Sequence, residues 1–437
     1  MRITGTIDED EIRKINPFDW KKEFPEIFEQ GGFDAVLGNP PYFLIALKNE
    51  KIYLKSNYKL STGKPDLYRY FIECSHQLIR KGGQFGFIIP NTLLAIPATK
   101  KLRKYLLYEG GLYKIVNFWG RVFEKASVNN IIIFTKKRTS PVSIEVIEDK
   151  SEIPSKESLD NFIKLKHLVE REVWLNDEQF KFSLSSTKEK VKIIEKIKKQ
   201  SVGLSSTAKY TLGMQVYHNS KHTKTQIKER IYHSDVKKDE TYYKESTGYN
   251  IQRYYFVNEF KKYVSYGDWC YNKPNWEFCS EPRMLIREIP AKTLVCAFSN
   301  STHIPTKAMI IVIATKVNLY YLMGILNSLL IGFYVQITGE KGSQRLFPRI
   351  SLTTVRKLPI RTIDFSKPKE KKMHDDLVLM VDRMLKFQKK SHSTRLEHDK
   401  KLYKTQLDLL DKQIDSLVYK LYELTEEEIK LVEDSKI

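Results

Sequence analysis

The sequence has little cysteine and no long apolar run. Its 437 residues include four cysteines, Cys74, Cys270, Cys279 and Cys296, and no two of them form a Cys-x-x-Cys pair. We therefore expect no disulfide framework and a reducing, cytoplasmic setting. No segment approaches the ~18 unbroken apolar residues of a membrane-spanning helix, and the first residues contain no apolar signal-peptide core. A membrane protein or a disulfide-stabilised secreted domain is not expected.

Acidic residues are also in short supply. Lys and Arg number 74 against 53 Asp and Glu, which gives a formal net charge of +21. An excess of this size favours a polyanionic partner such as nucleic acid. The alternative is a lysine-rich solvated surface encoded by an AT-rich genome, and the even spread of lysine along the chain supports it. The length and the 41% hydrophobic content are sufficient for two or three domains with cores of their own.

Strand and helix patterns alternate in the first 150 residues, which predicts an α/β domain with a mostly parallel sheet. Each apolar segment stops at Gly or Pro, and the helices are amphipathic. The expected strands are 33–38, 84–89, 113–119 and 129–135, and the expected helices are 66–81 and 97–108.

The rest of the chain divides into three segments. Residues 151–200 are charged and predict a largely helical connector. Residues 201–365 are rich in Tyr, Thr and β-branched residues and predict a mixed, mainly β domain, interrupted by one apolar helix over 319–333. Residues 366–437 predict a helical tail. Its leucine seam, 407–424, is under three heptads long, so we expect it to pack on its own domain rather than form a dimeric coiled coil. Thr425 and Glu428 fit a capping box.

The motif Asn39-Pro40-Pro41-Tyr42 directly follows the first predicted strand. The carboxyl edge of a parallel sheet is where α/β folds bind their ligands. The two prolines remove backbone donors and leave carbonyl acceptors. Such acceptors suit a substrate amine, because accepting both of its hydrogens leaves the nitrogen lone pair free to attack, while alignment lowers the barrier. Tyr42 offers a ring for stacking. A Pro-Pro turn that only ends a strand is the alternative for an isolated four-residue match.

With the segments that follow the motif, residues 33–137 resemble the adenine-N6 DNA methyltransferases of the gamma arrangement, which are common among type IIG restriction–modification enzymes. The similar segments are Asn39-Pro40-Pro41-Tyr42, Gly63–Tyr68 with Phe71, Gly82–Pro90, and Val122-Phe123-Glu124 before 129–134. The resemblance implies a partial class I methyltransferase-like sheet in residues 1–150 and S-adenosylmethionine as methyl donor.

The same resemblance implies a role for each matching residue. Asn39 and the Pro40 carbonyl would hold the target amine, and Tyr42 and Phe123 would sandwich an adenine flipped out of duplex DNA. Asn39, Asp66 and Phe71 would line the cofactor site. Flipping costs a few kcal/mol of stacking, and two aromatic faces return about 1–3 kcal/mol per stacked base.

The downstream half resembles the target-recognition domain of these enzymes at Leu326-Asn327-Ser328, Phe347-Pro348-Arg349 and Leu358-Pro359-Ile360. Residues 201–365 are therefore expected to choose the DNA sequence, because Arg, Lys and Asn read base edges. The candidate readers are Arg253, Lys273, Asn275, Arg283 and Arg287. For any single one, a phosphate contact or a plain surface charge is the competing interpretation.

The Gly-rich cofactor loop of this family precedes its catalytic motif, and the 38 residues before Asn39 contain no strand–GxG–helix pattern. The first three strands of the sheet are then expected to be absent, which would leave residues 33–38 with an open edge. A split enzyme that needs a separate polypeptide, or a recombinant fragment, explains this better than catalysis by the chain alone. No metal is expected, because His218 and His222 lack a third ligand nearby.

Two other functions compete with DNA methylation. The chain could be a non-catalytic DNA-recognition subunit or a remnant that lacks the cofactor-binding half. A protein glutamine methyltransferase also uses Asn-Pro-Pro-Tyr on an amide nitrogen. It is disfavoured because those enzymes lack the long basic sequence that follows the motif here.

Overall fold

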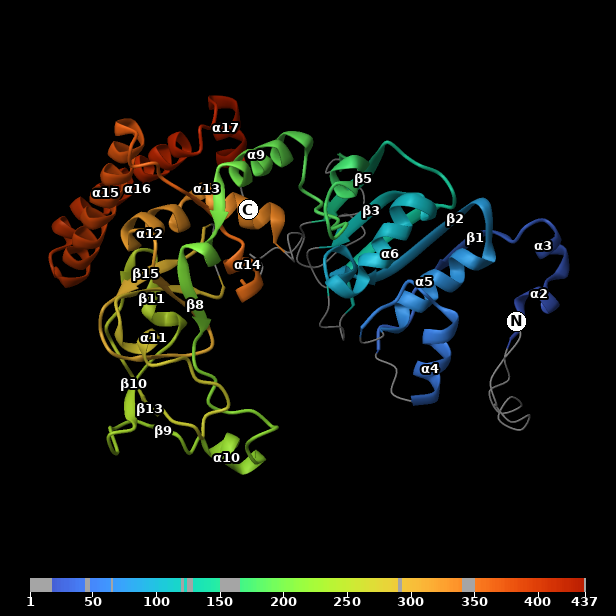
Figure 1. Cartoon of the computed structure of the whole chain (residues 1–437). Coiled ribbons are helices and arrows are strands. Elements are labelled where there is room, and N and C mark those ends of the chain that lie inside the picture. The colour runs from blue at the N-terminus through green and yellow to red at the C-terminus, as the bar shows by residue number, and fades with distance from the viewer. Residues whose placement is uncertain are drawn as a thin grey trace. The chain divides into compact units, whose positions relative to one another are not determined.

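The computed structural model forms two compact units, Met1–Lys188 and Glu189–Ile437 (Figure 1). It describes residues 18–43, 48–63, 66–118, 122–123, 129–149, 166–289, 293–339 and 350–435. The division falls inside the segment 151–200 that the sequence predicts as a connector.

The first unit is built on a six-stranded sheet with the order β1-β2-β4-β3-β5-β6. Its pairings show that β1, β2, β3 and β5 run in one direction, whereas β4 and β6 run in the other. The predicted α/β architecture is confirmed, but the sheet is mixed and not mostly parallel, because only the pairs β1–β2 and β3–β5 are parallel among its five described pairings. Strand β6 lies in the stretch expected to be helical. The strands are β1 (Phe33–Gly38), β2 (Ile79–Pro90), β3 (Leu112–Phe118), β4 (Asn130–Lys136), β5 (Ser143–Asp149) and β6 (Lys166–Glu170).

Short helices join these strands. They are α2 (Trp20–Glu23), α3 (Pro25–Glu29), α4 (Lys48–Asn57), α5 (Leu67–Leu78), α6 (Lys100–Tyr105) and α8 (Arg171–Leu175). Helix α5 ends three residues before the expected end, because the chain already enters β2 at Ile79. After α6 a π-helical turn, Leu106–Gly110, leads to Gly111, whose φ of +70° and close approach to the Lys136 carbonyl require glycine.

Within the second unit, residues 201–365 form a mixed domain of short strands and helices, and this is the part that the sequence predicts as mixed and mainly β. One antiparallel sheet has the order β15-β14-β17-β8 and another sheet has the order β16-β10-β13-β9. Their strands are β8 (Ala208–Leu212), β9 (His233–Ser234), β10 (Tyr242–Ser246), β13 (Tyr263–Ser265), β14 (Arg283–Arg287), β15 (Cys296–Ser299), β16 (Ile304–Pro305) and β17 (Met309–Ala314).

Smaller elements complete this domain. The two-stranded pairs are β11 (Ile251–Gln252) with β12 (Tyr255–Phe256), and β7 (Ser201–Gly203) with β18 (Pro359–Arg361). The helices of this part are α9 (Lys188–Lys199), α10 (Lys224–Glu229), α11 (Glu277–Ser280) and α14 (Leu352–Arg356).

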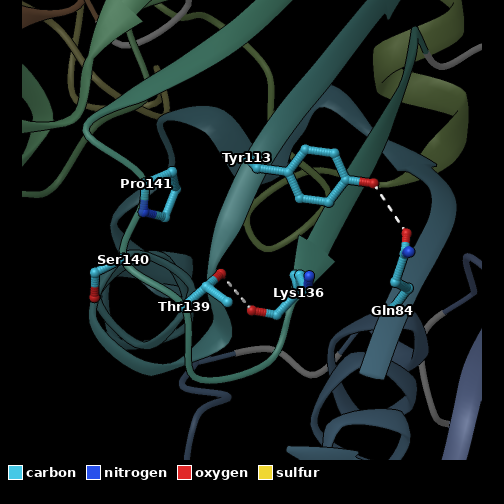
Figure 2. A pocket seen from close by; sticks show the side chains of 6 residues that line it. All are labelled: Gln84, Tyr113, Lys136, Thr139, Ser140 and Pro141. Carbon is cyan, nitrogen blue, oxygen red and sulfur yellow. Dashed lines mark hydrogen bonds between the residues drawn. The ribbon is translucent and has the colours of Figure 1, made fainter. Parts of the chain in front are cut away.

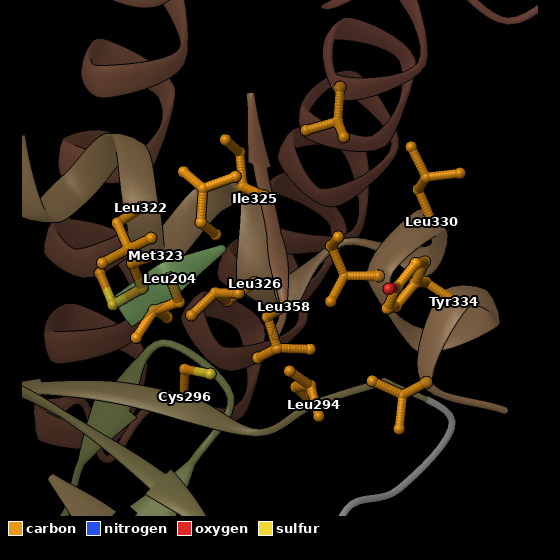
Figure 3. Close-up of a cluster of buried hydrophobic side chains, with 14 of the residues drawn as sticks. Leu204, Leu294, Cys296, Leu322, Met323, Ile325, Leu326, Leu330, Tyr334 and Leu358 are labelled. Atoms are coloured by element: carbon orange, nitrogen blue, oxygen red, sulfur yellow. The ribbon is translucent and has the colours of Figure 1, made fainter. Parts of the chain in front are cut away.

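The apolar stretch predicted as one helix over 319–333 forms two helices, α12 (Leu319–Asn327) and α13 (Leu329–Thr338), bent by 62°. Ser328 causes the break, because its hydroxyl accepts a bond from the Ile331 amide and thereby starts a new helix. Leu322, Ile325 and Leu330 lie in the core of the unit (Figure 3). Among the described residues, no single helix is long and apolar enough to cross a membrane.

The tail folds as α15 (Pro368–Ser393), α16 (Glu397–Leu421) and α17 (Glu426–Asp434). Leu410, Ile414 and Leu421 from the leucine seam are buried in the same core as α12 and α13, so the seam packs on its own domain as expected. The predicted capping box of Thr425 and Glu428 is present at the start of α17.

Asp415 on α16 supplies a distant contact to α13. Its Oδ1 accepts a bond of 2.8 Å from the Leu329 amide, 86 residues away, at the first turn of α13. Only 5% of Asp415 is exposed, and burial raises the pKa of its carboxyl to about 7. Between pH 4 and 7, the Asp415 carboxyl therefore keeps its proton in the folded unit, whereas in the unfolded chain it has lost that proton.

This difference in protonation predicts how the stability of the second unit depends on pH. Stability falls as pH rises through that window, because the buried carboxyl must ionise in the folded state. Asp415→Asn keeps the acceptor for Leu329 but removes the group that titrates. Between pH 5 and 8 we therefore expect the variant to lose about 2 kcal/mol less unfolding free energy than the unchanged protein loses. Urea denaturation at both pH values measures this, and Asp408→Asn, an exposed site on the same helix, is the control. Equal slopes for all three proteins would contradict it.

Candidate functional site

The Asn39-Pro40-Pro41-Tyr42 segment leaves the carboxyl end of β1, whose last residue, Gly38, pairs with Phe87 of β2. Pro40 is buried, whereas Asn39 is exposed and Tyr42 is half-buried. The proline ring anchors the turn in the unit and leaves the Asn39 amide at the surface. A polar acceptor is therefore presented at the carboxyl edge of the parallel strands, as the sequence predicts.

The hydroxyl of Tyr42 lies 2.9 Å from the Asn39 Oδ1 and 2.8 Å from the Ile88 carbonyl of β2, two acceptors that share one donor. Burial raises the pKa of Tyr42 to about 12, with the nearby Asn130 amide acting in the opposite direction. The phenol is therefore protonated, and donates, at any ordinary assay pH. These bonds tie the Asn39 side chain to the neighbouring strand.

The start of α5 adjoins this turn. The Leu67 amide donates to the Phe43 carbonyl at 3.2 Å, which brings Asp66 close to the segment that follows Tyr42. Asp66 forms an ion pair of 2.6 Å with the buried Arg69. Phe71, one turn further along α5, is 42% exposed. The three predicted cofactor residues thus lie on neighbouring segments, whereas Lys64 and Pro65 of the predicted motif fall outside the described residues.

Two further residues lie at this edge of the sheet. One comes from the connection between β3 and β4, and the other from the start of β4. Phe123 is partly exposed in that connection, at the same edge of the sheet as Asn39, because β3 runs in the direction of β1. Asn130, at the start of β4, is fully buried, and its amide lies close enough to the Tyr42 hydroxyl to act on the pKa of that phenol. The sequence reasoning did not select Asn130, although a polar pair before the apolar run 131–134 was a signal for it.

The predicted DNA readers lie in different environments. Arg283 is fully buried and donates to the carbonyls of Glu281 and Ser301 at 2.8 and 2.9 Å. Arg253 donates to the Asn327 carbonyl and forms an ion pair with Asp411. Both guanidinium groups therefore hold the domain together.

The other three predicted readers are nearer the surface. The Arg287 Nε donates to the Ile289 carbonyl at 2.7 Å. Lys273 forms a 2.9 Å ion pair with Asp268, and Asn275 is exposed nearby on the same loop. Of the five residues, Lys273 and Asn275 are thus the ones that share one exposed loop.

The histidine pair is engaged internally. The His222 Nε2 lies 2.9 Å from the Trp269 carbonyl, and His218 stacks on Tyr271. In the described parts of the chain, no group of three or more His, Cys, Asp or Glu residues could hold a metal ion.

A shallow pocket of about 470 Å³ lies at the other end of the sheet (Figure 2). It is lined by Gln84, Tyr113, Lys136, Thr139, Ser140 and Pro141, and the Tyr113 hydroxyl points at Gln84. The amino-terminal part of β2 forms one wall, so the pocket is separated by the length of the strands from Asn39 and has no part in the site.

The outer edge of β1 has no strand partner among the described residues, because β1 is the first strand in the sheet order. Leu37 on this strand is 74% exposed and lies over Gly86 of β2. The rings of Phe18, Trp20 and Phe24 lie beside Phe33 at its start and are partly exposed. An apolar strand with an unpaired edge is a site for pairing with another segment.

In this chain an α/β sheet with Asn-Pro-Pro-Tyr at its edge is followed by a mixed domain of strands and helices and by a helical tail. Residues 2–123 match the Eco57I restriction-modification methylase family, and residues 242–360 match the TaqI-like C-terminal specificity domain. The chain thus contains an Eco57I-type methylase segment and a TaqI-like specificity domain.

The chain is also similar to three named type II restriction or methyltransferase proteins. The chain is 22% identical over 504 residues to the type II restriction enzyme and methyltransferase Eco57I of Escherichia coli, covering 98% of this chain and 49% of that protein. It is 25% identical to the type II methyltransferase HincII of Haemophilus influenzae, covering 85% of this chain and 82% of that protein. The protein RM.MjaORFECS2P of Methanocaldococcus jannaschii is 28% identical, covering 94% of this chain and 33% of that protein. The chain thus spans half or less of two of these three relatives.

Two solved structures share the fold. The type IIL restriction–modification enzyme MmeI in complex with DNA superposes with a TM-score of 0.60 and 12% identity, over 94% of this chain and 58% of that chain. A nuclease-deletion mutant of the type ISP enzyme LlaGI with a DNA substrate mimic gives a TM-score of 0.50 and 12% identity, over 88% and 37%.

The Tyr42 hydroxyl provides a test of how the turn is held. Tyr42→Phe keeps the ring but removes the donor to Asn39 and Ile88. We expect the unfolding free energy of the first unit to fall by about 1 kcal/mol, the usual net value of one such bond. Tyr113→Phe at the opposite end of the sheet, where the hydroxyl makes an exposed 3.3 Å contact, should cost less. Thermal denaturation of both variants compares them, and a larger loss for Tyr113→Phe would contradict this account.

Proposed function

We propose that this chain is the motif-bearing and DNA-recognition portion of an adenine-N6 DNA methyltransferase of a restriction–modification system. The observation that carries the proposal is the Asn39 amide, exposed at the carboxyl edge of β1 and followed by the buried Pro40. This turn lies in the segment that matches the Eco57I methylase family. The type II methyltransferases among the relatives support the reaction class.

The chemistry of the turn suits an exocyclic amine. The Asn39 Oδ1 and the Pro40 carbonyl accept the two amine hydrogens, which draws the nitrogen toward tetrahedral geometry and leaves its lone pair free. Alignment then provides most of the rate, because the amine needs no strong base before it attacks. The nitrogen loses its proton after the new N–C bond forms.

In the structure described here, the Asn39 acceptor is already in contact with the Tyr42 hydroxyl. The Asn39 Oδ1 has two lone pairs, so the incoming amine either shares this oxygen with that hydroxyl or takes the place of the hydroxyl. The Ile88 carbonyl remains as the acceptor for Tyr42 when this happens. Tyr42 thereby keeps a polar anchor while its ring stacks on one face of the flipped base, and Phe123 covers the other face.

S-adenosylmethionine supplies the methyl group as a sulfonium when it is bound. The exposed ring of Phe71 and the neighbouring Asp66 fit one side of its site. Among the described residues, no Gly-rich loop joins a strand to a helix before Asn39. We infer that another segment, from the same longer protein or from a separate polypeptide, supplies this loop and pairs along the open edge of β1.

Double-stranded DNA is the proposed partner of the second unit. The TaqI-like specificity domain and the net charge of +21 support this assignment. The alternative function is DNA recognition without catalysis, and the open edge of β1 is the observation that favours it.

Transfer of labelled methyl groups tests the proposed reaction. The chain is incubated with duplex DNA and methyl-labelled S-adenosylmethionine, alone and together with a polypeptide that carries the Gly-rich segment. We expect label on the N6 atom of adenine in the combined reaction, and a loss of at least about 100-fold for Asn39→Ala, because a preorganised acceptor is removed at the reacting atom. Asn258→Ala, an exposed amide elsewhere, is the control. DNA binding without any transfer in either reaction would favour the recognition-only function.

The open edge makes a separate prediction. An unpaired apolar strand promotes self-association, and a lysine on such a strand prevents it. We expect Leu37→Lys to reduce the self-association of the isolated chain several-fold, as measured by light scattering over a concentration series. Leu168→Lys on β6, at the other edge of the sheet and 63% exposed, is the matched control. If Leu168→Lys had the larger effect, β1 would not be the pairing edge.

A further inference from the structure

The loop of residues 268–276, here called the reading loop, is an exposed segment of the specificity domain that contains three aromatic residues and two asparagines. Cys270 and Pro274 are buried, and the seven other side chains of the loop are exposed. The exposed aromatic residues are Trp269, Tyr271 and Trp276, which are 36%, 42% and 40% exposed. The loop lies within the part of the chain that matches the TaqI-like specificity domain.

The backbone of the reading loop is held in place by its neighbours. Asn272 exchanges two backbone hydrogen bonds with Gln215, at 2.9 and 3.0 Å. The Lys221 ammonium donates to the Cys270 carbonyl at 2.7 Å, and the Tyr266 hydroxyl donates to the Pro274 carbonyl at 2.6 Å. A loop fixed at three points loses little conformational entropy on binding a partner.

The aromatic side chains of the loop are fixed as well. The Trp269 indole lies against Gly267, where an added Cβ would stand 2.3 Å from the ring. Tyr271 stacks on His218 with ring centroids 4.1 Å apart, and Trp276 lies 4.8 Å from Tyr243. Each ring therefore keeps its exposed part in a defined position, as a recognition surface requires.

The reading loop carries no net charge, which distinguishes it from a surface that binds phosphates. Its charged residues are Asp268 and Lys273, which neutralise each other in a 2.9 Å ion pair. The chain as a whole carries +21, and the adjoining α10 region exposes Lys224, Lys228 and Arg230. Lysine and arginine supply the charge that attracts phosphates, so the α10 region fits the DNA backbone. The neutral loop fits a surface that carries no net charge, such as base edges.

The amides of the loop have the chemistry to read such edges. The side chains of Asn272 and Asn275 are exposed, and neither side-chain amide makes a hydrogen bond to any described residue. An asparagine amide matches the donor and acceptor pair that adenine presents at N6 and N7 in the major groove. Arg253 and Arg283, in contrast, donate to internal carbonyls, and Arg253 also pairs with Asp411.

We propose that the reading loop contacts base edges in the DNA target, that Asn272 and Asn275 select an adenine there, and that Lys224 and Lys228 hold the phosphates. This inference rests on the proposed function and names the part of the second unit that sets its sequence preference. The flanking rings of Trp269 and Tyr271 add apolar contacts, which favour a thymine methyl group beside the selected base.

Selection of duplexes from a randomised library tests the proposal. The chain, its double variant N272A/N275A, the double variant K224A/K228A and the control N258A each retain bound DNA, which is then sequenced. Affinity for the site selected by the unchanged chain is measured by fluorescence anisotropy over a range of salt concentrations. Thermal denaturation verifies that each variant is folded.

The two double variants are expected to differ in kind. N272A/N275A loses the adenine preference at one or two positions and binds the selected site about 10-fold more weakly, with an unchanged salt slope. K224A/K228A binds all sequences more weakly, keeps the preference, and shows a salt slope reduced by about 2.

The outcomes against the proposal are distinct. If N272A/N275A selected the same sequences as the unchanged chain, the reading loop would not read bases and its exposed rings would fit a protein partner instead. If the unchanged chain bound no DNA at all, the proposed function would fail together with this inference.

Discussion

The tyrosine hydroxyl that joins the end of β1 to β2 is the contact on which the site depends. In the described structure β1 has a neighbouring strand on one side, so the position of Asn39 relative to the sheet is fixed through β2. The bond from Tyr42 to the Ile88 carbonyl provides this link at the point where strand pairing has ended. Pro40 adds a buried ring but no donor. The acceptors that we propose for a base amine thus rely on one protonated phenol.

The local patterns of the sequence were sufficient to predict the elements around the Asn39 turn. A strand that ends in Asn-Pro-Pro-Tyr and an amphipathic helix from residue 66 are encoded within a few residues each, and both are present. The strand was expected to be buried, but β1 is largely exposed, because it lies at the edge of the sheet. The break between α12 and α13 was missed, because an apolar run with helical spacing conceals a capping residue such as Ser328 in its middle. Strands β5 and β6 were missed, because both are rich in charged residues and β6 has only five residues, so neither shows a clear apolar pattern.

The environment of charged residues was the least predictable feature. Arg283 and Lys273 are both basic residues in the same domain, yet one is fully buried among carbonyls and the other is near the surface. Burial of a guanidinium depends on whether distant carbonyls converge on it, and sequence spacing does not record this. Burial also lowers the pKa of Arg283 to about 10, which shows how thoroughly this side chain is removed from water.

The contact between Asp415 and the first turn of α13 links the order of synthesis to the order of folding. Helix α13 leaves the ribosome 86 residues before the carboxylate that completes its amino-terminal hydrogen bonds. Until α16 is made, that turn lacks its carboxylate acceptor, and Leu410, Ile414 and Leu421 are missing from the core around α12 and α13. The specificity domain therefore reaches its final packing only when the last helices arrive. The helical tail is for this reason a structural part of the domain and not an appendage that can be removed.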